Sequence, residues 1–208
     1  MAINSFPHVR FYSGINASTL KKKYRDLDRK KPKINDDEVM THMVMGSAIV
    51  DGRLELDRCK LIAIDKNFAE KNQVLFLRPR DLLLKCSVPY DAALVGDEID
   101  SAYKVVVPNY AIIARCNEGY NREFLWAFFN SGAYRRQFAE VADGSKLPMV
   151  TIKRLEKIRI PDYDLAQQEK IGQYFSNVLE QKRLIDGWIN AQMDNMDHLF
   201  EAGKGGAV

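Results

Sequence analysis

Short runs of apolar residues separated by turn signals occupy the chain between residues 39 and 115. The runs recur about every ten residues, and Asp51-Gly52 and Pro108-Asn109 are turn dipeptides between them. This spacing is typical of a twisted mixed or antiparallel sheet, or of a barrel. The segments that we expect to be extended are 39–50, 54–56, 61–64, 74–77, 82–84, 104–107 and 111–115.

The pattern changes after residue 120, where apolar residues recur at helical spacing. The segment 121–140 carries an aromatic face, and Ser131-Gly132 interrupts it. We therefore expect two helices joined by a turn. A loop at 143–148 follows, then a short element at 150–152 and a last strand at 158–160 that Pro161 ends.

The segment 164–200 contains no proline and predicts one long helix. Asp164 is the expected N-cap, with Gln167 three residues later in the capping-box position. The helix would span about 55 Å, whereas the preceding part would have a radius of gyration of only about 15 Å. A partner helix in a coiled coil is therefore expected along its apolar stripe, although packing on its own domain would use the same residues. The stripe consists of Ile171, Phe175, Val178, Ile185, Trp188, Met196 and Leu199.

Composition fits a globular protein with an appendage. The chain has 208 residues, of which 46% are hydrophobic and 28% charged, and this excludes disorder of the whole chain. We expect an α/β (α+β) fold: a globular domain at 1–162 with a twisted mixed sheet and packed helices, a long helix at 163–202, and a flexible tail at 203–208. No apolar run is long enough to cross a membrane and the first residues do not resemble a signal peptide, so we expect a cytoplasmic protein.

Basic residues are concentrated in one stretch, although the net charge is only +3. Between residues 21 and 33 there are eight Lys or Arg residues and two Asp residues. Such a strip can contact nucleic-acid phosphates, but a solvated surface has the same composition, and the sequence leaves both interpretations open. The candidate DNA contacts are Lys21, Lys22, Lys23, Arg25, Lys30, Lys31 and Lys33, with Lys85, Ser145 and Lys146 elsewhere in the chain.

Motifs for catalysis or metal binding are not found in the sequence. His8, His42 and His198 lack metal-ligand spacing, and the three cysteines are too far apart for a zinc knuckle or a disulfide framework. Nucleophile-elbow, phosphate-loop, methyltransferase and nuclease motifs are missing. We therefore expect no catalytic residue, no metal site and no cofactor in this chain.

An ordered set of segments resembles the specificity subunit of type I restriction–modification systems. Three positions depart from the family pattern: Arg80 stands where Gly is usual, Gln167-Gln168 replaces a Glu-Gln pair, and Gly172 replaces Ala. The segments are LRPRDLLLK (77–85), YAIIAR (110–115), EFLWAFFNS (123–131), the glycine loop at 144–145, VTIKRLEKIRIP (150–161) and QEKIG (168–172).

The resemblance implies a target-recognition domain that reads half of a split double-stranded DNA sequence. It also implies a helix that acts as a spacer and docks on methyltransferase subunits, which would bind S-adenosylmethionine, with a restriction subunit in systems that cleave DNA. Full-length members carry two such domains, so a half-size chain would pair with itself, its helices antiparallel, on a symmetric target. Three alternatives stay open: a stand-alone DNA-binding or regulatory protein without enzyme partners, an enzyme with an unrecognised motif, and an oligomerising scaffold.

Overall fold

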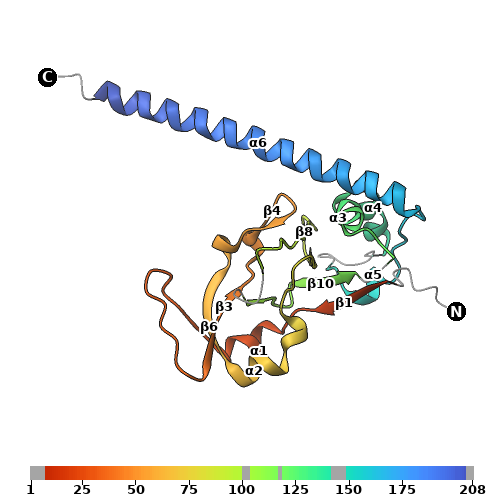
Figure 1. The fold of residues 1–208 in the computed structure, drawn as a ribbon, viewed down its shortest axis with the longest axis horizontal. Coiled ribbons are helices and arrows are strands. Elements are labelled where there is room, and N and C mark those ends of the chain that lie inside the picture. The colour runs from red at the N-terminus through yellow and green to blue at the C-terminus, as the bar shows by residue number, and fades with distance from the viewer. Residues whose placement is uncertain (1–7, 100–103, 117–118, 142–148, 205–208) are drawn as a thin grey trace.

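The computed structural model describes residues 8–99, 104–116, 119–141 and 149–204. Figure 1 shows a head that contains two sheets and several short helices, and one long helix, α6, that crosses the head and projects beyond it. This arrangement confirms the predicted α/β class and the long C-terminal helix.

The first sheet has six strands in the order β1-β10-β7-β8-β5-β4. Its neighbours are antiparallel except β5 and β8, which pair in parallel at Arg53 and Leu94. The strands are β1 (Val9–Ser13), β4 (Ile49–Val50), β5 (Arg53–Leu54), β7 (Leu82–Lys85), β8 (Ala92–Leu94) and β10 (Ala111–Cys116).

The second sheet has four strands in the order β2-β6-β3-β9. Here β3 and β9 are parallel and the other pairs antiparallel. The predicted mixed pairing is thus present, but it is divided between two sheets. The strands are β2 (Tyr24–Asp26), β3 (Glu38–Met43), β6 (Lys60–Asp65) and β9 (Val105–Val106).

Short helices connect and cover the sheets. The predicted interruption at Ser131 is confirmed, because its Oγ accepts a hydrogen bond from the Tyr134 amide (3.2 Å) at the start of α4. Asn130 fixes α3 to β8, since its side chain both accepts from and donates to the Ala92 backbone, at 3.1 and 2.9 Å. The elements are α1 (Ala17–Lys21), α2 (Lys66–Lys71), α3 (Arg122–Asn130), α4 (Gly132–Val141), α5 (Ile152–Leu155) and the 3-10 turns Gly46–Ala48, Leu56–Arg58 and Gln73–Leu75.

The long helix α6 (Leu165–Lys204) begins with the predicted capping box. Asp164 Oδ1 accepts the Gln167 amide at 2.7 Å, and Gln167 Oε1 accepts the Asp164 amide at 3.2 Å. The first turns then lie against α3 so closely that a Cβ on Gly172 would come within 2.8 Å of the Phe124 amide nitrogen. Position 172 therefore requires glycine.

Two segments that we expected to be strands have other structures. Ile158 is buried, but 158–160 pairs with no strand in the part of the chain that the structure describes. The side-chain amide of Gln137 takes that place: it accepts from the Arg159 amide at 2.8 Å and donates to the Arg159 carbonyl at 2.9 Å. The segment 74–77 begins in the 3-10 turn Gln73–Leu75 and reaches β9 only through a single bridge at Phe76.

Candidate nucleic-acid interface

Six lysines of the basic stretch are exposed at one side of the head. Three lie at the end of α1, of which Lys21 is its last residue, and three lie in the loop 27–37 between β2 and β3. Strand β2 is an edge strand of the four-stranded sheet, and Figure 1 shows the loop extending away from the head on the side opposite α3 and α4. Within the described ranges no ion pair involves these lysines, which are Lys21, Lys22, Lys23, Lys30, Lys31 and Lys33.

Arg25 has a different position from the lysines. Its guanidinium forms a two-pronged pair with Glu38, Nε to Oε1 at 2.8 Å and Nη2 to Oε2 at 2.6 Å, and Nη2 also donates to the Lys33 carbonyl at 2.9 Å. The hydrogen bonds from Arg25 and from the Asn35 amide hold the pKa of Glu38 below its usual range. Because Nε and Nη2 are used within the chain, Arg25 fixes the base of the loop and has fewer free donors for a phosphate than the lysines have.

A second arginine holds the same loop at its start. Arg29 donates to the carbonyl oxygens of Leu56 (3.4 Å) and Cys59, both outside the loop. Asp28 accepts the Lys30 amide at 2.9 Å, which closes a turn. The loop is therefore held by side-chain hydrogen bonds to the head, and its lysines project into solvent.

Lys85 does not belong to this surface. Its side chain is only 15% exposed, and its Nζ lies 3.3 Å from the Ile49 carbonyl and 3.8 Å from an Asp91 carboxylate oxygen. The ammonium group links β7 to β4 inside the sheet, so a DNA contact by Lys85, which stays a prediction, would first have to break these contacts. The other two predicted contacts, Ser145 and Lys146, lie outside the described residues.

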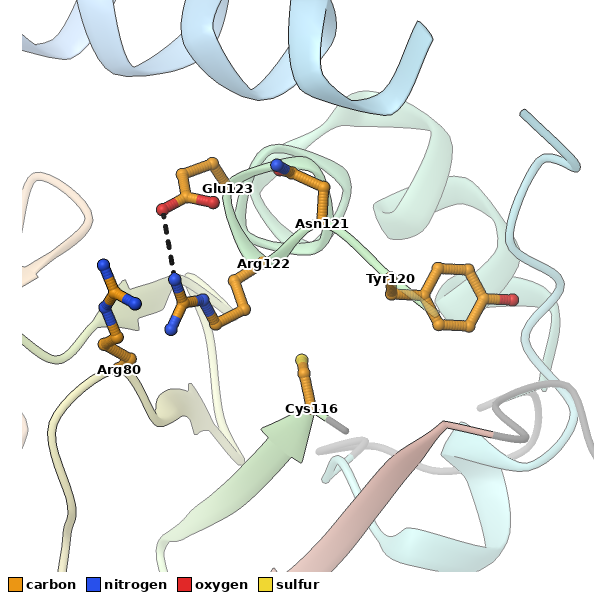
Figure 2. Close-up of a pocket in the computed structure, with 6 residues that line it drawn as sticks. All are labelled: Arg80, Cys116, Tyr120, Asn121, Arg122 and Glu123. Carbon is orange, nitrogen blue, oxygen red and sulfur yellow. Dashed lines mark ion pairs between the residues drawn. The ribbon is translucent and has the colours of Figure 1, made fainter. Parts of the chain in front are cut away.

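A polar cavity lies at the opposite part of the head, where the turn before β7, the end of β10 and the start of α3 meet. Its volume is about 360 Å³. Figure 2 shows two guanidinium groups at the same side of the cavity, and the sequence analysis did not select either as a site residue. The lining residues are Arg80, Cys116, Tyr120, Asn121, Arg122 and Glu123.

Groups suited to redox or acid–base chemistry are buried. Burial raises the pKa of the Cys59 and Cys86 thiols to about 11 and that of Cys116 to about 12, so all three are neutral at pH 7. Burial lowers the pKa of His42. In the part of the chain that the structure describes, no three His, Cys, Asp or Glu side chains cluster as metal ligands would, and no helix is long and apolar enough to span a membrane.

The predicted stripe on α6 is divided between two environments. Ile171 and Phe175 pack into the core of the chain's own head, with the Phe175 ring 4.9 Å from that of Trp126. Both side chains are partly buried against their own head, and the prediction that they also belong to a surface for another chain stays a prediction. The rest of the stripe is exposed, Trp188 to 66% and Leu199 to 75%, together with four residues that we did not predict: Leu184, Ile189, Met193 and Phe200.

Two ion pairs brace the middle of α6 against the β4–β5 hairpin. Lys182 Nζ lies 2.8 Å from Asp51 Oδ2, and Arg53 Nη2 lies 3.1 Å from Glu180 Oε2. The hairpin turn itself uses positive φ angles at Asp51 (47°) and Gly52 (75°). Beyond this brace the helix projects from the head, as Figure 1 shows.

Comparison with known proteins gives a structural likeness. No protein-family model and no curated protein sequence matches the chain. A chain from a structure on complex assembly and conformational transition of the type I R-M system is similar to 94% of this chain, with a TM-score of 0.54 and 14% identity. The HsdS subunit from Thermoanaerobacter tengcongensis aligns over 84% of this chain and 38% of its own length, with a TM-score of 0.41 and 12% identity.

The first of these likenesses extends over 94% of this chain. The alignment includes nearly all of the head and helix but only 44% of the other chain. The chain thus spans less than half of the length of that protein. Its architecture, two sheets with a projecting helix, is similar in fold to part of a chain from that type I restriction–modification (R-M) structure.

Proposed function

We propose that the chain is a DNA sequence-specificity component of a type I-like R-M system. It reads one half of a split DNA target with its head and directs partner methyltransferase subunits, and restriction subunits where these exist, through its helix. The chain itself performs no catalysis. The observation that supports this most is the helix α6, whose far half carries large apolar side chains that the head does not cover.

A second copy of the chain is the partner that best fits this helix. Residues Val178, Ile185, Ile189, Met196 and Leu199 follow the alternating three- and four-residue spacing of a two-stranded coiled coil, with Lys182 and Gln192 at the remaining positions. Water contact with so much apolar surface is unfavourable, and a partner helix would remove it.

The charges along α6 favour an antiparallel pair. The half of the helix next to the head, 165–184, has a net charge of +1, and the far half, 185–204, has a net charge of −3. The charged residues are Glu169, Lys170, Glu180, Lys182 and Arg183 in the first half and Asp186, Asp194, Asp197, Glu201 and Lys204 in the second. An antiparallel arrangement brings opposite charges together, and a parallel one brings the acidic halves together. Since 40 residues of helix span about 60 Å, the two heads would lie at opposite ends of the rod. Two identical heads so placed suit a symmetric target with two separated half-sites.

Placing charge in the apolar stripe should separate the two copies. For Ile185→Glu combined with Leu199→Glu, we expect self-association to weaken at least about a hundredfold, because each carboxylate would have to lose water in the interface. Light scattering at micromolar concentration should then give a mass near 23.8 kDa, against twice that value for the unmodified chain.

The control for this experiment adds the same charge to another face of α6. Gln173 is exposed and lies away from the stripe, so Gln173→Glu should leave the mass unchanged. A mass of 23.8 kDa for the unmodified chain would contradict the proposed self-association.

A further inference from the structure

Arg80 has a backbone conformation that does not suit arginine. Its φ is +69°, in the left-handed region that glycine adopts without strain. The turn 78–81 requires this angle: Pro79 precedes it, the Asp81 amide donates to the Arg78 carbonyl at 3.1 Å, and the Arg80 amide donates to Val95 at 3.0 Å. The specificity-subunit pattern that this segment resembles has glycine at this point. An arginine in this backbone conformation calls for a role of its side chain.

That side chain lines the cavity together with Arg122. Figure 2 shows both guanidinium groups on the same side of it, and the nearest carboxylate oxygen to Arg122, on Glu123, is 3.9 Å away. Among the described residues the Arg80 guanidinium forms one ion pair, with Asp97 at 3.4 Å, and both of these side chains are exposed. Two like charges in one concave site repel each other, and neither has a close, two-pronged carboxylate within the described ranges. An anion between them would supply the missing acceptors.

The charge of the cavity limits the anion that fits. Arg80 and Arg122 contribute two positive charges to the lining and Glu123 one negative charge, and Asp97 beside Arg80 adds a second negative charge. A phosphodiester would bring a single negative charge between the two guanidinium groups, whereas a nucleoside triphosphate would bring several negative charges against Glu123 and Asp97. The start of α3 at Arg122 adds the weak positive field of a helix N-terminus.

We propose that Arg80 and Arg122 bind a backbone phosphodiester of DNA. This inference rests on the proposed function, and it adds a phosphate contact separate from the exposed lysines. The cavity is built from the six-stranded sheet and α3, whereas the lysines belong to α1 and the edge of the four-stranded sheet. DNA bound by the chain would therefore contact two parts of the head.

The substitution Arg80→Gly distinguishes phosphate binding by the side chain from a structural role of residue 80. Glycine relieves the backbone strain, so the midpoint of thermal unfolding should rise by about 2 °C or more. The same change removes one phosphate contact, so affinity for duplex DNA should fall about five- to tenfold near 0.1 M salt, and the slope of log K against log salt should decrease by about one. Arg122→Gln should give the same loss of affinity without the rise in stability.

Arg58 provides a matched control. Its side chain is exposed to 54%, against 58% for Arg80, and it too pairs with one neighbouring carboxylate. Arg58→Ala should leave DNA affinity within twofold of the unmodified value. If Arg80→Gly left DNA affinity unchanged while charge reversal of the lysines still abolished DNA binding, the cavity proposal would be overturned. The proposed function would remain intact.

Inorganic phosphate tests the cavity independently of DNA. Broadening of the ³¹P signal by the unmodified chain, but not by Arg80→Gly, would support a phosphate site. If the unmodified chain did not bind DNA in the same conditions, the ligand of that site would be free phosphate and not a DNA phosphodiester. No broadening together with no DNA binding would overturn both the cavity proposal and the DNA-binding part of the proposed function.

Discussion

Reversing the charge of Lys21, Lys22 and Lys23 to glutamate should lower the affinity for duplex DNA by about a hundredfold or more near 0.1 M salt. The three ammonium groups are exposed and lack ion-pair partners among the described residues, so they can contact phosphates without first breaking another pair. Each lost phosphate contact also reduces the slope of log K against log salt by about 0.9. The loss should be the same for every DNA sequence, because phosphate contacts position the protein and do not read bases.

The matched control is a second lysine trio elsewhere on the chain. Lys153, Lys157 and Lys170 are also exposed but lie on α5, in the turn after it and in the first turns of α6, and reversing them should change DNA affinity far less. Fluorescence anisotropy with a labelled duplex over a range of salt concentrations measures both effects. If reversing Lys21, Lys22 and Lys23 left the slope of log K against log salt unchanged, these lysines would be excluded from the interface.

Arg115→Ala should lower the free energy of unfolding by about 3–5 kcal/mol. Arg115 makes a two-pronged pair with the buried Asp81, its Nε 3.0 Å from Oδ1 and its Nη2 3.1 Å from Oδ2. It also donates to the carbonyls of Val74 (2.7 Å) and Phe76 (2.5 Å). Burial raises the pKa of Asp81, and the hydrogen bonds from Arg115 and from the Arg78 amide oppose that rise. Without Arg115 the carboxylate and two carbonyls lose their donor inside the head.

Urea unfolding with a companion variant identifies the cause. In Asp81→Ala with Arg115→Ala no buried charge is left alone, so this double variant should be no less stable than Arg115→Ala. If Arg115→Ala lowered the free energy of unfolding by less than about 1 kcal/mol, the Arg115–Asp81 pair would not be what joins 74–76 to the six-stranded sheet.

The local signals in the sequence predicted the elements that depend on neighbouring residues. The capping box of Asp164 and Gln167, the Asp51-Gly52 turn and the interruption at Ser131 are all properties of a few adjacent positions, and the structure confirms them. The segment 158–160 has the composition of a strand but has no neighbouring strand, because the Gln137 side chain occupies its edge. Strand pairing is set by distant segments, which a pattern of apolar residues does not identify.

The candidate site was predictable only in part for the same reason. Composition identified the basic strip, but it could not distinguish Arg25, whose donors Glu38 uses, from the exposed lysines beside it. Nor could it place Lys85 inside a sheet, or show that Phe175 packs on Trp126 of its own head. Arg80 did give a signal, since it replaces a glycine of the family motif, and the positive φ there shows why that departure matters.

Sequencing of methylated DNA measures whether this chain directs a methyltransferase to its target sites. A partner methyltransferase is incubated with DNA and S-adenosylmethionine, with and without this chain, and the modified sites are read. We predict methylation at one symmetric, two-part sequence only when the chain is present, and no methylation by the chain alone. If the methyltransferase modified the same sites with and without the chain, the proposed role of the chain in sequence specificity would be contradicted.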